Sequence, residues 1–281
     1  MNKLKKEIEF DDILTKDEYI DLKKRVSFNG FDFVAKDIQL SVIESENPRD
    51  ILKMAKIKGA DIKALQEAMI KTGNLEYICL FAESIKGADK KALAQAIVKA
   101  GDPVYIYRFA CDVKSADVPV LQEGIIAAGD SEYMYKFARD IEKSDPKEIS
   151  KAIIESGDAK CMFFMALDFE DVDKQEIQKG IVDAGNAEYM FWFALHIKEA
   201  DKNLLEEKII ESGDTKYMYH FAHDIKDADK DRLGEEIKRI GAKEYIDKFD
   251  RYINGIGQVN GNTNDKQKKG KEAPEDGDRS L

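Results

Sequence analysis

The sequence predicts an all-α protein, a right-handed α-solenoid of stacked antiparallel helix pairs. Two observations predict this fold: a glycine recurs every 28 residues, and the apolar residues between these glycines have helical spacing. The recurring glycines are Gly73, Gly101, Gly129, Gly157, Gly185, Gly213 and Gly241. With each glycine numbered zero, an Asn or Asp stands at position +1 six times, and an Asp stands at +16 in seven units.

These recurring residues mark helix ends. Glycine takes the left-handed conformation that closes a helix, and the Asx side chain after it caps the next helix. The Asp at +16 is expected to cap the second helix of the unit in the same way. Pro103 and Pro146 each follow a proposed cap, where a missing N–H costs little. We therefore expect the first helix of each unit from +2 to +13, and the second from +17 to +26.

The apolar positions support this assignment. In the first helix they are +4, +5, +8, +9 and +12, and in the second +20, +24 and +25. Both sets have the 3.6-residue period of an amphipathic helix. In the unit that starts at Gly129 the first set is Tyr133, Met134, Phe137, Ala138 and Ile141. One helix pair cannot bury such a face alone, so about six full repeats should stack between capping units.

Three segments follow from the repeat. Residues 1–44 are expected to form a helical amino-terminal cap, in which Thr15–Glu18 is a capping box. Residues 45–253 form the repeat domain, with units that start near residues 45, 73, 101, 129, 157, 185, 213 and 241. Residues 254–281 are almost devoid of hydrophobic side chains and are expected to be a disordered polar tail.

The composition bears on where the protein is located and on what it binds. No apolar run reaches the ~20 residues that a membrane-spanning helix needs. The amino terminus lacks a secretion signal's apolar stretch, and the three cysteines are far apart, so we expect a cytoplasmic protein with reduced thiols. The net charge of −11 disfavours a nucleic-acid partner.

Motifs such as GDSEYMYKFARDI followed by SD recur through residues 46–253. This pattern resembles α-solenoids of the HEAT, armadillo and leucine-rich-variant type, although the unit is shorter than a HEAT or armadillo unit. It also resembles uncharacterised repeat arrays of bacterial and phage-related proteins. The resemblance implies a binding scaffold and no catalytic residues.

Recognition is expected at the exposed positions that vary between repeats, which are +7, +10 and +11 of the first helices. Along the array they change from basic to apolar and then to histidine. Together with two aromatic residues at +6, the candidate binding residues are Arg108, Lys136, Arg139, Phe163, Phe164, Leu167, Phe191, Trp192, Leu195, His220 and His223.

Two consecutive first helices, with the sequences CMFFMALDF and YMFWFALHI, are apolar nearly all round, and we call them the apolar block. This block is the strongest indication of a binding surface. We expect Phe164, Leu167, Trp192 and Leu195 to be partly exposed and to bind a foreign protein or a second copy of the chain. The alternative is internal packing, in which Phe163 and Phe164 refill volume that is lost where Cys161 and Met165 replace Tyr and Phe.

Three function classes compete. A protein-binding scaffold without cofactors explains the repeat, the apolar block and the acidic charge, and an inhibitor that occupies the basic groove of a nucleic-acid-handling host-defence enzyme is one form of it. A nucleic-acid reader of pumilio type is the alternative. The sequence contains no nucleophile–base pair or phosphate loop, so an enzyme is not expected. His196, His220 and His223 could ligate a metal, but their spacing matches no stronger metal signature.

Overall fold

The computed structural model describes residues 14–259, apart from the side chains of residues 28, 29 and 254–259. Over this range the chain forms 17 α-helices and no strand. The predicted all-α fold is therefore confirmed, while the handedness of the solenoid stays a prediction. Most of the expected polar tail, residues 260–281, lies outside the described part of the chain.

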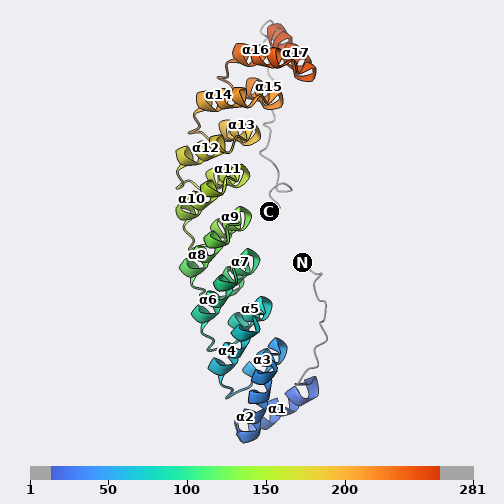
Figure 1. The fold of residues 1–281 in the computed structure, drawn as a ribbon, viewed down its shortest axis with the longest axis vertical. Helices are drawn as coiled ribbons and strands as arrows, with labels where there is room; N and C mark the ends of the chain where they lie inside the picture. Colours follow the sequence, from blue (N-terminus) through green and yellow to red (C-terminus); the bar gives the residue numbers. More distant parts are fainter. Residues whose placement is uncertain (1–13, 260–281) are drawn as a thin grey trace. The chain divides into compact units, whose positions relative to one another are not determined.

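The helices group into two compact units that divide after Ala128. Figure 1 shows the helices of both units. Unit 1 contains α1 (Lys16–Asn29), α2 (Phe33–Ser45), α3 (Pro48–Ala55), α4 (Ile62–Thr72), α5 (Leu75–Ser84), α6 (Lys90–Ala100), α7 (Pro103–Asp112) and α8 (Val118–Ala128). Unit 2 contains α9 (Ser131–Asp140), α10 (Pro146–Ser156), α11 (Ala159–Asp168), α12 (Lys174–Asp183), α13 (Ala187–His196), α14 (Lys202–Ser212), α15 (Thr215–Asp224), α16 (Lys230–Ile240) and α17 (Lys243–Val259).

Unit 2 consists of two layers of helices. Each odd-numbered helix from α9 to α15 packs against the even-numbered helix that follows it, and also against the next odd-numbered helix. The odd-numbered helices therefore form one layer and the even-numbered helices the other, as α9 to α16 show in Figure 1, where they run from green to orange. In unit 1, α3 to α8 pack in the same pairwise manner. Stacked helix pairs are what the 28-residue period predicts.

The helix ends confirm the predicted caps. Gly157 closes α10 with φ +77°, and the carboxylate of Asp158 accepts a hydrogen bond from the Cys161 N–H at 3.0 Å. In unit 1 the predicted capping box is present, since the Thr15 side chain and the Glu18 side chain each bind the other's backbone N–H.

Two predicted boundaries were wrong. The first helices end at +11 rather than +13; for example, α9 ends at Asp140 and Ile141 is extended, with φ −102° and ψ 104°. Ile141 is nevertheless buried, so it continues the apolar period of a helix that has already ended. At the carboxyl end α17 continues to Val259, six residues past the boundary at 253 that was expected from the lack of hydrophobic side chains beyond it. Polar residues and single glycines weaken a helix without forbidding it.

A buried polar link between repeats was not predicted. A Gln or Glu on an even-numbered helix accepts a hydrogen bond from the backbone N–H of the Asp that caps the next even-numbered helix. Gln66 accepts from Asp89 at 2.8 Å, and Gln178 accepts from Asp201 at 2.8 Å. Glu206 replaces the glutamine in the next repeat and accepts from Asp229 at 2.9 Å.

Candidate functional site

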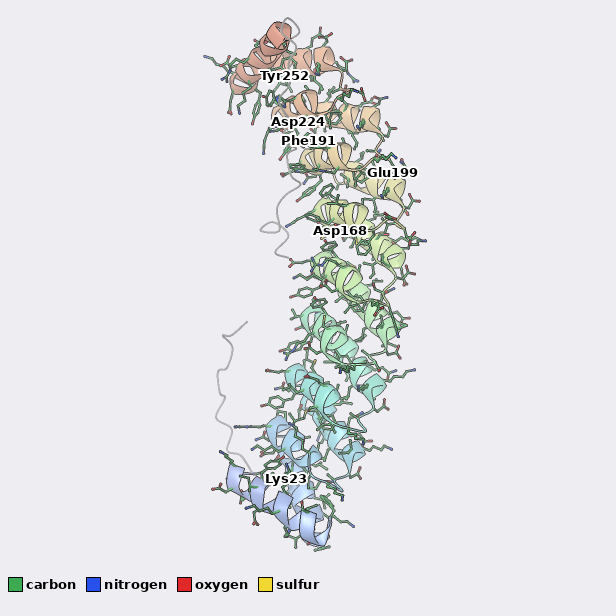
Figure 2. All side chains as sticks on the ribbon, turned by 180° about the vertical axis from the view of Figure 1, so that it is seen from behind. Lys23, Asp168, Phe191, Glu199, Asp224 and Tyr252 are labelled. Carbon is green, nitrogen blue, oxygen red and sulfur yellow. The ribbon has the colours of Figure 1, made fainter. Side chains whose placement is uncertain are left out.

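The candidate site lies on the odd-numbered layer of unit 2, along α11, α13, α15 and α17. We use the name ring band for its partly or fully exposed side chains, which are Leu167, Trp192, Leu195, His196, Tyr219, His220, His223 and Tyr252. In Figure 2 the labelled Asp168, Phe191, Asp224 and Tyr252 follow one another along this layer, while Glu199 marks its opposite edge.

Three predicted binding residues lie in the core instead. Phe163 and Phe164 are both 0% exposed, and Phe191 is 2% exposed. The expectation that Phe164 is partly exposed was therefore wrong. The two phenylalanine rings pack against each other with their centres 5.4 Å apart, and Phe164 also packs against the ring of Tyr135 on α9, at 5.8 Å. The packing interpretation holds for these rings and leaves Leu167, Trp192 and Leu195 as the half-buried apolar part of the predicted block.

Trp192 is held by two rings of its own helix, α13. Its ring centre lies 5.2 Å from that of Phe191, and 5.6 Å from that of His196, with which it is stacked at an interplanar angle of 20°. The Nε1 of Trp192 and the Nε2 of His196 are both buried and have no hydrogen-bond partner among the described residues. An unsatisfied buried polar atom costs about 1–3 kcal/mol, so two in one stacked pair need an explanation.

The histidines of the band differ in their environments. Burial lowers the pKa of His196, so this ring is neutral at pH 7. On α15, the Nδ1 of His223 lies 2.6 Å from one oxygen of Asp224, and the Nδ1 of His220 lies 3.9 Å from the other. Among residues 14–259 no group of three or more His, Cys, Asp or Glu side chains is placed to hold a metal ion.

Tyr252, on α17, continues the band beyond the histidines. Its ring centre is 4.7 Å from that of His223, and its hydroxyl donates to the Ala222 carbonyl at 3.2 Å. The same hydroxyl oxygen accepts from Lys230 Nζ at 2.8 Å. Sequence reasoning missed this residue, although it occupies the +11 position that was assigned to the exposed stripe.

The predicted cations are each paired with a carboxylate. Lys136 lies 2.9 Å from Glu132, and Arg139 lies 2.8 Å from Asp140. In unit 1, Arg108 lies 3.3 Å from Asp112.

Arg139 also packs over the ring of Tyr135, whose hydroxyl donates to Asp168. Burial, together with the hydrogen bond to the Asp168 carboxylate, raises the pKa of Tyr135 to about 12. This hydroxyl therefore stays protonated at neutral pH and links α9 to α11. The basic end of the predicted stripe is a set of local ion pairs rather than a field of unpaired positive charge.

Cys79 and Cys161 are buried thiols that are not activated as nucleophiles. Burial raises the pKa of Cys79 to about 11, and burial also raises the pKa of Cys161 well above its usual value. Both thiols are therefore protonated at neutral pH, and a thiol is a weak nucleophile compared with a thiolate. The surface is suited to contact through rings and apolar side chains.

Comparison with protein-family models, curated proteins and solved structures gave no match. In the part of the chain that the structure describes, no helix combines the length and the apolar character needed to cross a membrane.

Proposed function

We propose that this chain is a non-enzymatic protein-binding scaffold that binds its partner through the ring band of unit 2. The observation that supports this most directly is the stacked Trp192–His196 pair, whose buried ring nitrogens have no hydrogen-bond partner among the described residues. A partner that supplies an acceptor, or that lets Trp192 change its rotamer, removes this cost on binding. Tryptophan is also the residue most enriched at binding hot spots.

The band has the composition of an interface core. Leu167, Leu195 and Trp192 supply apolar area, and His220, His223 and Tyr252 extend it with amphipathic rings. Interfaces of this kind are rich in aromatic residues and poor in charge at the centre. We also propose that the chain is a solenoid of HEAT, armadillo or leucine-rich-variant type, which agrees with the stacked helix pairs of each unit.

The chain's net charge of −11 favours a partner with a basic surface. An inhibitor that occupies the basic groove of a nucleic-acid-handling enzyme is the form of the proposal that this charge supports. The alternative, direct nucleic-acid binding of pumilio type, requires cations that are available to phosphates. The ion pairs of Lys136 with Glu132 and of Arg139 with Asp140 count against it.

A matched pair of leucine variants tests the proposal. Leu195 on α13 and Leu204 on α14 belong to the same repeat and are both half-buried, but they lie on opposite layers. We expect Leu195→Gln to weaken binding of the purified partner at least about tenfold and Leu204→Gln to leave it unchanged.

The partner is obtained by affinity capture from the cells that produce the chain and is then purified, and sedimentation equilibrium tests for a second copy of the chain. Equal affinity of both variants for the partner would overturn the assignment of the odd-numbered layer. Loss of dimerisation in Leu195→Gln alone would make the partner a second copy.

A further inference from the structure

The amino-terminal end of unit 1 presents an apolar surface that the repeat does not explain. Among the side chains that the structure describes, seven large hydrophobic ones are exposed, and four of them lie on α1 and α2. Phe33 is 76% exposed, Leu40 56%, Val34 49% and Ile20 40%. The terminal units of a repeat array normally have a polar outer face, because no further repeat covers them. This end surface therefore requires an occupant.

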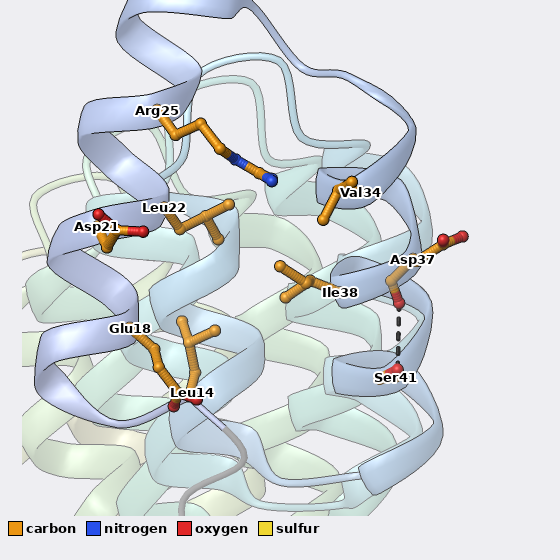
Figure 3. A pocket seen from close by; sticks show the side chains of 9 residues that line it. All are labelled: Leu14, Glu18, Asp21, Leu22, Arg25, Val34, Asp37, Ile38 and Ser41. Atoms are coloured by element: carbon orange, nitrogen blue, oxygen red, sulfur yellow. Dashed lines mark hydrogen bonds between the residues drawn. The ribbon is translucent and has the colours of Figure 1, made fainter.

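A cleft of about 380 Å³ opens between α1 and α2. Figure 3 shows Leu14, Leu22 and Ile38 directed into the space between the two helices, with Arg25 reaching across it toward Val34. The cleft is thus an apolar furrow that is flanked by the Arg25 cation and by the carboxylates of Glu18, Asp21 and Asp37.

Arg25 has a hydrogen-bonding group that the described residues leave unused. Its Nη2 is buried and lies 3.3 Å from an oxygen of Asp32, but the geometry of that ion pair is not that of a hydrogen bond. On the far side of α1, Lys23 and Lys24 line a second, shallower cleft of about 450 Å³ together with Tyr19 and Ile20. The first cleft therefore combines apolar walls with charges of both signs, and the second combines them with lysines, which suits an apolar segment that carries both acidic and basic residues.

The chain itself supplies such a segment. Residues 1–13, MNKLKKEIEFDDI, contain five large apolar residues, three lysines and four acidic residues. They join the described chain at Leu14, which lines the cleft and is 2% exposed. Leu14 is anchored on α3, since its N–H donates to Asp50 at 3.3 Å and its carbonyl accepts from Lys53 at 2.8 Å. The segment thus begins at the edge of the cleft.

We propose that residues 1–13 bind back over α1 and α2, with Ile8 and Phe10 against the apolar furrow. A tethered segment has an effective concentration on the order of millimolar at such a site, so it outcompetes a second copy at ordinary protein concentrations. The segment completes the terminal cap and keeps this face from associating with other molecules.

Hydrogen exchange of the full chain, followed by mass spectrometry, tests the proposal. Amides of residues 4–13 should exchange at least about tenfold more slowly than in the free peptide of that sequence. The protection should be lost in Ile8→Asp/Phe10→Asp, which changes only the segment. It should also be lost in Val34→Asp, which changes only the surface.

Val104→Asp is the matched control. Val34 and Val104 are both the second residue of a helix with an aspartate N-cap, and they are 49% and 45% exposed. Val104→Asp should leave the segment protected. Absence of protection in the wild type, or equal protection in both valine variants, would overturn the proposal. Protection that disappears on dilution would show that a second copy, not the chain's own segment, covers the face.

Discussion

The buried link between Gln178 and Asp201 provides the sharpest test of how the repeats are held together. Gln178 is 2% exposed, and its Oε1 accepts the Asp201 N–H at 2.8 Å. Gln178→Ala removes this acceptor and leaves a part-buried backbone N–H without it. Loss of the hydrogen bond and the unsatisfied donor together cost about 1.5–3 kcal/mol of the free energy of unfolding. At ~2–4 °C per kcal/mol, the melting temperature should fall by about 3–12 °C.

Gln175→Ala is the matched control for this experiment. Gln175 lies on the same helix and also reaches the next repeat, where its Nε2 donates to the Glu199 carbonyl at 2.9 Å, but this contact is exposed. Exposed contacts change stability by only about 0.5 kcal/mol or less. Thermal unfolding followed by circular dichroism measures both variants. If the melting temperatures of Gln178→Ala and Gln175→Ala differ by less than roughly 2 °C, the buried hydrogen bond does not contribute the stability proposed for it.

Three further predictions follow from individual residues. Gly157→Val places a β-branched residue at φ +77° and should destabilise the chain by about 1–2 kcal/mol in urea unfolding, through backbone strain alone, because no atom lies within 4 Å of the added Cβ. Burial raises the pKa of Glu206, so stability falls as pH rises from the unfolded pKa through the folded one. Glu206→Gln should therefore raise the melting temperature at pH 7, and this advantage should shrink as the pH falls and the Glu206 carboxylate takes up a proton. Lys136→Glu/Arg139→Glu should leave retention on a nucleic-acid column unchanged, and a steep, salt-dependent loss of retention in that variant would favour the nucleic-acid alternative.

The period of the sequence was sufficient to predict the helix pairs and their caps, because a glycine and an Asx residue each perform a local task that sequence spacing reveals. Helix ends were less predictable. Ile141 continues the apolar period but adopts an extended conformation, since the core buries it whether or not it is helical. Periodicity reports which residues are buried and does not report which backbone conformation buries them.

The candidate site was predicted only in part, for a similar reason. Helical geometry assigned Phe164 to the exposed stripe, but its ring is buried against those of Tyr135 on α9 and Phe163. Such packing depends on several neighbours and cannot be deduced from the position of one residue. Leu167, Trp192 and Leu195 remain partly exposed, as predicted. The 28-residue period continues unchanged across the division after Ala128, so the sequence did not predict that division.

Fluorescence of Trp192 tests the central claim most directly, because it is the single tryptophan of the chain and lies in the ring band. Its emission and its quenching by acrylamide are measured while the purified partner is added, with Leu195→Gln as the binding-deficient comparison. The account predicts a saturable change in emission and protection from acrylamide that follow the binding curve. Binding that saturates while both the emission and the quenching of Trp192 stay constant would contradict it.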